Sequence, residues 1–387
     1  MNRKGVFLKF GCPYPSLIGV LLFLLAACSV PKEKIGVSKP ALHLKYAKRF
    51  SISASTNYTL VSLFGKRASF DTTMTFVLSA DTSYRHRLRE RQVFVAFPCR
   101  KIAALSSIYS AMFAELGALD QLAAIDNSEY SNNKTILQKV RQGSLLELSK
   151  GPEPDLEQTL KLKPDLLFMF GMGESESAFP QRLREAGIPV AIVLDHLEDH
   201  PLGRAEWIRF FGAFSGHSRQ ADSLFTEVEK NYLKLKEKAA VYITQPSVFS
   251  EIKYGDVWYM PAGKSFMALL IADAGGKYLW ADVPQTGSLP LSLEQVLTRA
   301  VHADIWLNQP LVFSRKQLLA ADSRYAAFNA FQSGKMYNNT KNRNAFGYSD
   351  YWESGMIHPD RILGDLIQIF HGDSLAKSSL YYYEQLH

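Results

Sequence analysis

Cysteine is scarce in this chain of 387 residues, which contains only three. Cys12 and Cys28 lie in or directly after an apolar N-terminal stretch, so Cys99 is the single thiol of the remaining chain and no internal disulfide is expected. A protein without disulfides depends on its apolar core. Hydrophobic residues make up 47% of the chain and aromatic residues 12%, which is ample for a core, and the length predicts two lobes.

A hydrophobic run long enough to cross a bilayer is also lacking. The apolar stretch from Leu17 to Ala27 has about eleven residues, whereas a spanning helix needs roughly twenty. Three basic residues precede this stretch, and Leu25-Ala26-Ala27-Cys28 closes it. This order predicts a signal peptide over residues 1–27 that is cleaved before the cysteine.

The Leu-Ala-Ala-Cys sequence resembles the lipobox of bacterial lipoproteins, in which the cysteine takes a diacylglycerol and becomes the new N-terminus. The resemblance implies lipidation of Cys28, with the membrane as a partner and a location in the cell envelope, on the periplasmic face or the outer surface. One buried acyl chain holds a protein only marginally, so more than one chain is expected. The alternative is an ordinary signal peptide with a chance cysteine after it.

A strong charge of one sign is missing as well. The net charge is +7, and three basic residues but no acidic ones precede Cys28, so the body after it carries about +4. This charge is too small and too dispersed to predict a nucleic-acid partner. The chain also has no G-x-S-x-G, H-E-x-x-H, P-loop or dinucleotide-binding motif, and these absences argue against an enzyme.

The segments after the cysteine differ in character. Residues 28–44 hold several lysines without apolar periodicity, which is typical of a lipidated tether. β-Branched and aromatic residues dominate 50–64 and 71–80, which predicts a hairpin. This hairpin opens an N-terminal lobe that we predict over residues 45–200.

From residue 101 onward, short apolar runs alternate with segments of helical spacing, as in βα units on a parallel sheet. In the first lobe this predicts strands at 102–105, 122–125, 166–170 and 189–194 and helices at 106–116, 156–162 and 179–186. Residues 201–240 keep helical spacing almost throughout and predict a linking helix. A second lobe over 241–387 is predicted to hold strands at 248–252 and 305–307 and helices at 266–274, 293–300, 359–370 and 374–386.

Four segments carry a resemblance to a known family: PCRKIAALSSIYSAMFAELGALDQLAAID at 98–126, PDLEQTLKLKPDLLFM at 154–169, YGDVWYMPAGKSFMALLIADAGG at 254–276 and LSLEQVL at 291–297. In this order, the chain resembles the class III substrate-binding proteins of bacterial ABC importers, which serve ferric siderophores, haem and cobalamin. The resemblance implies an α/β fold of two lobes, each with a central, mostly parallel sheet and flanking helices, joined by one long rigid helix. It also implies a monomer with one ligand held between the lobes.

The resemblance further implies partners and docking residues. The partners are an ABC importer permease with its ATPase and a small organometallic or metal-chelate ligand. Glu157 and Glu294 match the family's glutamates that pair with permease arginines, and such rim charges set orientation and association rate. The alternative is that both are ordinary solvent-facing helix residues.

Ligand contacts are expected in the loops at the carboxyl ends of the strands. Tyr130 follows the second strand, at a position resembling one where haem-binding members place a tyrosine whose phenolate ligates ferric iron. Lining the cleft without ligation is the alternative for this residue. Aromatic faces hold flat macrocycles and catecholates, so ligand contacts are also predicted for Tyr254, Trp258, Tyr259 and Trp280, with packing of the core as the alternative for the two tryptophans.

Two polar clusters complete the candidate site. His196 and His200 lie among three acidic residues, and on a helix this spacing would allow the side chains to chelate a divalent metal. Pro201 also allows a turn at this point, in which acidic residues cap the next helix. We predict His196 as a ligand contact and no metal site. Arg343 is a candidate for meeting a carboxylate of the ligand, and a solvated loop is the alternative.

Together these features predict a lipid-anchored binding protein that delivers an iron compound, a ferric siderophore or haem, to an ABC importer without acting on it chemically. The ligand itself contains iron or cobalt, and no cofactor is expected. Cobalamin is the alternative ligand. A surface lipoprotein that captures haem and a secreted chelatase or hydrolase are the alternatives from other classes.

Overall fold

The structure is a computed structural model, and the residues it describes are 1–2, 5, 35, 42–65, 72–149, 154–171, 178–310, 312–372 and 379–387. Cys28, nearly all of the predicted signal peptide and most of the predicted tether lie outside these residues. Residues 37–387 form one compact unit, which the following description concerns. Among the described residues, no helix combines the length and the apolar content that crossing a membrane requires.

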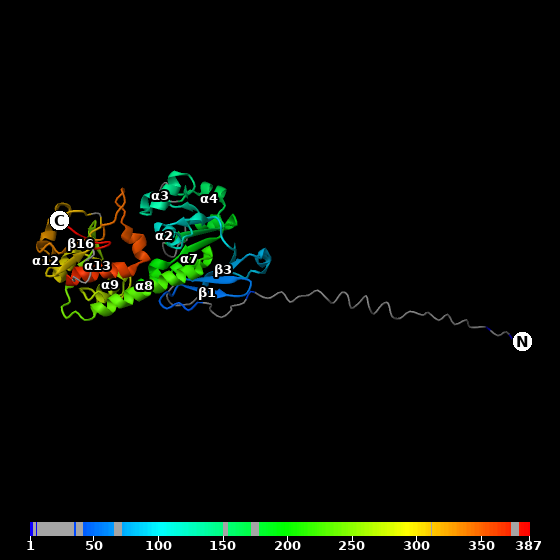
Figure 1. Ribbon diagram of the computed structural model, residues 1–387, viewed down its shortest axis with the longest axis horizontal. Helices are drawn as coiled ribbons and strands as arrows, with labels where there is room; N and C mark the ends of the chain where they lie inside the picture. Colours follow the sequence, from blue (N-terminus) through cyan, green and yellow to red (C-terminus); the bar gives the residue numbers. More distant parts are fainter. Residues whose placement is uncertain are drawn as a thin grey trace. The chain divides into compact units, whose positions relative to one another are not determined.

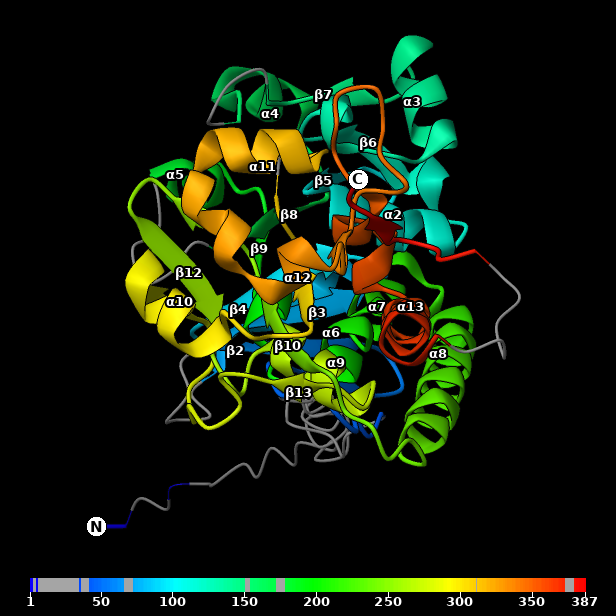
Figure 2. The same ribbon diagram turned by 90° about the vertical axis from the view of Figure 1, so that its left-hand side faces the viewer.

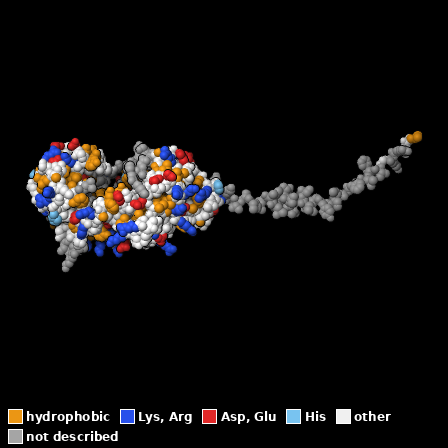
Figure 3. Space-filling model, turned by 90° about the horizontal axis from the view of Figure 1, so that it is seen from above, with side chains coloured by type: hydrophobic (Ala, Val, Ile, Leu, Met, Phe, Trp, Pro, Cys, Tyr) orange, Lys and Arg blue, Asp and Glu red, His pale blue; other side chains and the backbone are white. Residues whose placement is uncertain are grey.

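The compact unit has two α/β lobes, as the sequence predicts. Strands β1 to β9 belong to the N-terminal lobe and β10 to β17 to the C-terminal lobe. Helix α8 (Ser218–Ala239) runs from one lobe to the other (Figure 1). On the face shown in Figure 3, Lys and Arg side chains are intermixed with Asp and Glu over both lobes.

The main sheet of the N-terminal lobe is parallel, with the strand order β7-β6-β5-β8-β9. Its strands are β5 (Ile102–Leu105), β6 (Leu122–Ile125), β7 (Leu146–Glu147), β8 (Leu166–Phe170) and β9 (Val190–Val193). Side chains alternate between two apolar clusters, with Phe168 on one face and Leu167 on the other. Helices α2 (Ser107–Glu115) and α7 (Ile208–Ser215) cover the first face, and α4 (Leu156–Leu162) and α5 (Ala178–Glu185) cover the second.

The predicted hairpin is part of a larger, four-stranded sheet. Its strands, in spatial order, are β1 (Phe50–Ala54), β2 (Thr59–Phe64), β3 (Thr72–Ser79) and β4 (Gln92–Ala96). The first predicted arm therefore contains two strands, because the chain turns between Ser55 and Tyr58. Phe50 packs against Trp207 at 4.8 Å and Phe76 against Phe214 at 5.4 Å, which joins this sheet to α7.

The predicted single helix over 201–240 is divided into three helices: α6 (Pro201–Ala205), α7 and α8. We call these three helices the spine. Gly216, with φ of 77°, ends α7 in the left-handed conformation that glycine adopts readily. Gly212 does not interrupt α7; it lets α8 approach, since a β-carbon there would lie 2.5 Å from Cβ of Ala221.

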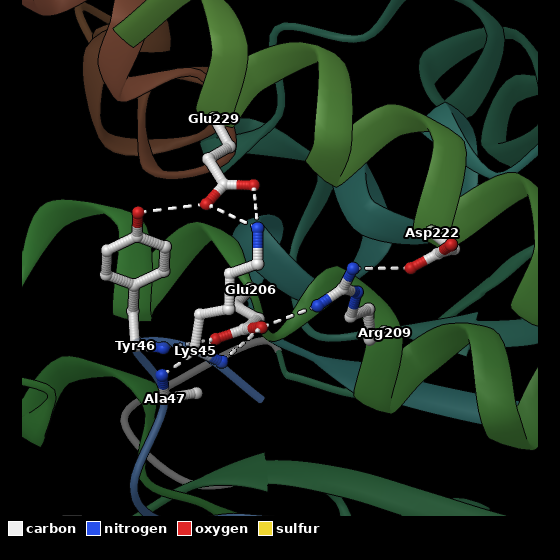
Figure 4. Close-up of polar contacts among 7 residues, drawn as sticks. All are labelled: Lys45, Tyr46, Ala47, Glu206, Arg209, Asp222 and Glu229. Atoms are coloured by element: carbon white, nitrogen blue, oxygen red, sulfur yellow. Dashed lines mark hydrogen bonds and ion pairs between the residues drawn. The ribbon is translucent and has the colours of Figure 1, made fainter. Parts of the chain in front are cut away.

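The spine also holds the segment that precedes β1 (Figure 4). Glu206, fully buried after α6, accepts hydrogen bonds from the backbone N–H groups of Lys45, Tyr46 and Ala47 at 2.8 to 3.0 Å. Glu229 of α8 accepts from Lys45 Nζ at 2.8 Å and from the Tyr46 hydroxyl at 2.9 Å. Arg209 of α7 neutralises Glu206 at 2.6 Å.

The C-terminal lobe is built on a five-stranded sheet in the order β13-β10-β15-β16-β17. Its strands are β10 (Ser247–Ser250), β13 (Lys277–Tyr278), β15 (Ile305–Leu307), β16 (Met336–Asn338) and β17 (Glu384–Gln385). A second sheet holds β11 (Lys253–Tyr254), β12 (Val257–Pro261) and β14 (Ser288–Leu291). The helices are α9 (Phe266–Asp273), α10 (Leu293–Ala300), α11 (Arg315–Ala321), α12 (Asn329–Gln332) and α13 (Pro359–His371), and α13 lies along α8 (Figure 2).

The helix predicted over 374–386 is wrong where the structure describes that range. Residues 379–387 contain no helix, and β17 pairs antiparallel with β16. The backbone N–H groups of Tyr381, Tyr382 and Tyr383 instead bind the carboxylate of Asp365 on α13. This side-chain acceptor replaces the carbonyls that a helix would offer, and the sequence spacing gave no sign of it. Most of the other predicted strands and helices agree with the structure to within two residues.

The close contact of α7 with α8 leads to a stability prediction. Gly212→Ala should lower the free energy of unfolding by about 1 to 3 kcal/mol, because the new methyl group overpacks against Ala221. Gly212→Ala/Ala221→Gly should recover part of this loss relative to the sum of the single variants. Urea unfolding of the four proteins measures the coupling, and strictly additive losses would contradict the packing argument.

Candidate functional site

Strand order places the candidate site at two crevices. In the N-terminal lobe the chain moves from β5 outward to β7 on one side and then to β8 and β9 on the other. In the C-terminal lobe the corresponding change of direction lies between β10 and β15. Open α/β sheets bind ligands outside the carboxyl ends of strands at such points. The residues directly after these strands are Ser106, Gly171, Glu251 and Asn308.

Glu251 and Asn308 form the crevice of the C-terminal lobe. Both have left-handed backbones, with φ of 68° and 55°, which is unusual for residues other than glycine and is typical of functional sites. Burial raises the pKa of Glu251 to about 8, against an opposing hydrogen bond with Asn308. Glu251 is therefore a carboxyl group that keeps its proton near neutral pH. Glu251 is not among the residues predicted from the sequence, although its place directly after β10 was a signal for it.

The crevice of the N-terminal lobe has a buried polar group at its base. Asp195, after β9, accepts a hydrogen bond from the Tyr109 hydroxyl at 3.3 Å and pairs with Arg204 of α6 at 3.1 Å. Nearby, after β6, burial raises the pKa of Asp126 to about 6. The charge on Asp195 is compensated by Arg204, so this pair orders the base of the crevice.

The two crevices meet at the spine. The guanidinium of Arg204 lies 5.6 Å from the ring centre of Phe266, the first residue of α9. The Tyr351 hydroxyl, fully buried, lies 3.7 Å from the sulfur of Met267. The first contact connects the base of the N-terminal crevice to the C-terminal lobe, and the second lies within the C-terminal lobe.

A segment of the C-terminal lobe bridges the lobes farther out. We call residues 343–353 the bridging segment. Asn344 Nδ2 donates to the backbone carbonyls of Glu129 and Ser131, at 2.7 and 3.1 Å. Glu353 accepts from the Ser131 hydroxyl at 2.8 Å and from the Asn132 backbone at 2.5 Å, and burial raises its pKa. In Figure 2 this orange segment lies beside β6 and α3 (Lys134–Arg141).

Tyr130 lies at this bridge and faces a second tyrosine. Its ring meets that of Tyr348 edge to face, with centroids 4.8 Å apart, and the two side chains are 38% and 44% exposed. Burial is the first cause that raises the pKa of Tyr130, followed by the neighbouring Tyr348. Phe346 and Trp352 add two more exposed aromatic rings to the bridging segment. The sequence predicts Tyr130 but not Tyr348, Phe346 or Trp352, because their stretch shows no periodicity.

The other predicted aromatic contacts do not gather around Tyr130. Tyr254 and Tyr259 are exposed on the β11–β12 sheet. Trp258 is fully buried, donates from Nε1 to the Ser250 carbonyl at 2.9 Å and stacks on Trp306 at 5.8 Å. Trp280 is 3% exposed, with Arg299 over its ring at 5.3 Å. Both tryptophans therefore pack the lobe and offer almost no surface to a ligand.

Arg343 is held within its own lobe. Its Nη1 donates to Glu384 at 2.6 Å and to the Thr340 carbonyl at 2.8 Å, and its guanidinium lies 4.9 Å from the ring centre of Phe313. The side chain remains 39% exposed. A carboxylate of a ligand would therefore compete with Glu384 for this cation.

The cluster that contains His196, His200 and the neighbouring acidic residues contributes to the packing and capping of the N-terminal lobe. His196 packs on Phe170 at 4.2 Å, and burial lowers its pKa. His200 accepts the Leu202 N–H at 3.0 Å and so caps α6, where the turn alternative expects an acidic residue. Among the described residues, no group of three or more His, Cys, Asp or Glu side chains is placed to hold a metal. Cys99 is buried, and burial raises the pKa of its thiol to about 12.

The two predicted docking glutamates occupy matching positions. Glu157 is the second residue of α4 after the Asp155 cap, and Glu294 is the second residue of α10 after the Ser292 cap. Both are exposed. A hydrogen bond to its own backbone lowers the pKa of Glu294, and its side chain pairs with Arg324 at 2.9 Å.

Two cavities among the described residues lie away from these crevices. A groove of about 470 Å³ runs between α8 and α13 and includes Lys234 and Tyr381 in its walls. A cavity of about 10 Å³ near Glu115 and His358 holds no more than one water. Neither is lined by the predicted ligand residues.

Comparisons with known proteins agree with the fold. The profile of a family described as periplasmic binding protein matches residues 102–342. An uncharacterized lipoprotein of Methanocaldococcus jannaschii is 24% identical over 253 residues, which cover 65% of this chain and 58% of the relative. The match therefore spans little more than half of that relative's length.

Two solved structures are similar in fold. The periplasmic haem-binding protein RhuT of Roseiflexus, in apo form, has a TM-score of 0.55 at 21% identity, covering 71% of this chain and 98% of that one. The periplasmic vitamin B12 binding protein BtuF of Vibrio cholerae has a TM-score of 0.51 at 16% identity, covering 70% and 96%. At these identities the likeness concerns the fold alone.

The unusual carboxyl group of Glu251 leads to a prediction of pH dependence. The folded protein keeps the proton of Glu251 up to a pKa of about 8, whereas an unfolded glutamate loses it near 4.5, so its contribution to stability falls as pH rises between these values. We expect Glu251→Gln to be more stable than the native protein at pH 9 by on the order of 2 kcal/mol, and similar to it at pH 5. Urea unfolding at both pH values measures this, with Glu157→Gln as an exposed control. An equal difference at both pH values would refute the protonated carboxyl.

Proposed function

The chain belongs to the periplasmic binding protein family, whose members bind ligands rather than transform them, and we propose that it is the ligand-binding component of an ABC importer for an iron compound. The permease with its ATPase is the proposed partner. Haem or a ferric siderophore is the proposed ligand, and the site is the region between the two crevices. The observation that carries the proposal is the pair of tyrosines, Tyr130 and Tyr348, which meet across the lobes.

The chemistry of this pair suits ferric iron. A phenolate is a hard oxygen donor, and hard donors match Fe(III) better than a soft thiolate does. One phenol comes from each lobe, so a ligand that engages both would hold the lobes together. Phe346 and Trp352 supply exposed aromatic faces for a macrocycle or a catecholate. Entry of the ligand would require the hydrogen bonds of the bridging segment to open.

The lipid anchor belongs to the same proposal. Lipidation at Cys28 would keep the body at the membrane that holds the permease, and the M. jannaschii relative carries the name lipoprotein. The permease contact would use Glu157 and Glu294, each exposed at the start of a helix. Arg324 already compensates Glu294, so a permease arginine would have to replace it.

Absorbance titrations test the ligand and the tyrosines together. The native protein should bind haem or a ferric siderophore at one to one, with a phenolate-to-iron charge-transfer band. Tyr130→Phe keeps the ring and removes only the oxygen, so this variant should lose the band and bind roughly 10- to 100-fold more weakly. Tyr348→Phe should weaken binding in the same titration if its phenol also meets the ligand.

Three controls make the titration decisive. Tyr254→Phe removes a phenol of an exposed tyrosine on the β11–β12 sheet and should leave affinity unchanged. Tight binding of cyanocobalamin with no effect of either tyrosine would move the ligand to cobalamin and contradict the iron proposal. No binding of haem, a ferric siderophore or cyanocobalamin would contradict the importer proposal for these ligands.

The docking glutamates are tested by separating binding from transport. Glu157→Gln/Glu294→Gln should keep the ligand affinity of the native protein, because neither side chain lies at the crevices, and should reduce uptake at least tenfold in vesicles with the reconstituted permease. Glu227→Gln/Glu237→Gln on α8 is the matched control. Full uptake with the first double variant would remove these glutamates from the docking surface.

A further inference from the structure

The bridging segment connects the carboxyl ends of the two main sheets. It follows β16 in the C-terminal lobe and reaches the loop after β6 in the N-terminal lobe. Open α/β sheets bind their ligands outside these ends of the strands. The segment therefore crosses from one lobe to the other on the side of the molecule where the proposed site lies, beside β6 and α3 in Figure 2.

The base of the segment is fixed to its own lobe. Asn342 Nδ2 donates to the Tyr381 carbonyl at 2.9 Å, and the Asn342 carbonyl accepts the Asp350 N–H at 2.7 Å. Arg343 forms an isolated antiparallel bridge with Ser349. These contacts hold both arms of the segment on the C-terminal lobe, so its base can stay in place when the contacts across the lobes break.

The tip of the segment is a turn that one side chain organises. Asn344 Oδ1 accepts the backbone N–H groups of Phe346 and Tyr348 at 3.0 and 3.1 Å, and the Asn344 N–H donates to the Tyr348 carbonyl at 3.0 Å. Gly347, with φ of 90°, is the residue of this turn with a left-handed backbone. The turn is therefore ordered by hydrogen bonds of its own, which do not involve the N-terminal lobe.

Two side chains of the segment hold it to the N-terminal lobe. The other end of the Asn344 amide, Nδ2, donates to the carbonyls of Glu129 and Ser131. Glu353, 2% exposed, accepts from the Ser131 hydroxyl and from both the backbone and the side-chain N–H groups of Asn132. A neutral hydrogen bond shifts such an equilibrium by roughly 2- to 10-fold, and a bond to a carboxylate shifts it further.

We infer that Asn344 and Glu353 form a gate, which opens for a ligand to reach the region between the lobes and closes again once the ligand is bound. This inference rests on the proposed function, because the gated site is the one proposed there. The same hydrogen bonds then stabilise the closed form with and without ligand. Their loss should raise the rates of ligand entry and exit together and change the affinity little. Loss of a direct ligand contact would instead raise mainly the exit rate.

Hydrogen exchange in the ligand-free protein tests the opening of the gate. The Asn132 backbone N–H donates to Glu353 across the lobes, so its exchange reports that opening. Asn344→Asp keeps the acceptor that orders the tip and removes the donor to the N-terminal lobe. We expect the Asn132 amide to exchange roughly tenfold faster in this variant, as measured by NMR at single amides. The Asp350 amide, bonded within its own lobe, should exchange as in the native protein.

Stopped-flow mixing with haem measures the two rates, with release followed in an excess of a haem scavenger. Asn344→Asp should bind and release haem roughly tenfold faster than the native protein, with a dissociation constant that differs by less than about threefold. Ser131→Ala removes a donor to Glu353 from the other lobe and should also raise both rates. Asn342→Asp is the matched control, because it makes the same change of charge and loses an amide bond within the C-terminal lobe, and it should keep the native rates.

Three outcomes would overturn the inference. These are native exchange of the Asn132 amide in Asn344→Asp, a rise of the release rate alone, and equal effects of Asn344→Asp and Asn342→Asp. If haem does not bind at all, the proposed haem site fails, and the exchange of the Asn132 amide still decides about the gate: faster exchange in Asn344→Asp supports it and unchanged exchange overturns it.

Discussion

The constraint on which the rest of the structure depends is the spine, α6 to α8, which belongs to both lobes. Phe210, Phe211 and Phe214 of α7 pack against Phe168 of the N-terminal sheet at 5.0 to 5.9 Å. Farther along, Tyr232 and Lys236 of α8 bind Asp273 of α9 at 2.7 and 2.8 Å. Because one continuous set of helices packs into both cores, the spine joins the two lobes through packed side chains as well as through the chain.

The site combines two physical properties. At its base, charges are compensated or suppressed: Arg204 pairs with Asp195, and burial raises the pKa of Glu251 to about 8. At its outer side, exposed aromatic rings of the bridging segment meet Tyr130. A neutral, aromatic surface with few polar groups suits a flat metal chelate better than a small hydrated ion. This balance agrees with the proposed iron compound.

The sequence predicted most of the fold because the spacing of apolar residues that marks a strand or a helix involves only positions close together in the chain. The strands at 102–105 and 305–307 and the helices at 156–162 and 293–300 agree residue by residue with the structure. The helix after residue 373 failed because Asp365, distant in sequence, binds the backbone there. The tryptophans show the same limit for the site: Trp258 lies next to the exposed Tyr259, yet its neighbours across the lobe, Trp306 and Phe249, bury it. Tyr348 became a candidate only through Tyr130, its neighbour in space.

The central claim is that one ligand is held between the two lobes, near Tyr130 and Tyr348. Hydrogen exchange of the protein without ligand and with saturating haem tests this most directly. The account predicts that the amides of 127–132 in one lobe and 343–353 in the other slow together, while those beside the groove between α8 and α13 do not change. Slowing in one lobe alone, or at that groove, would contradict it.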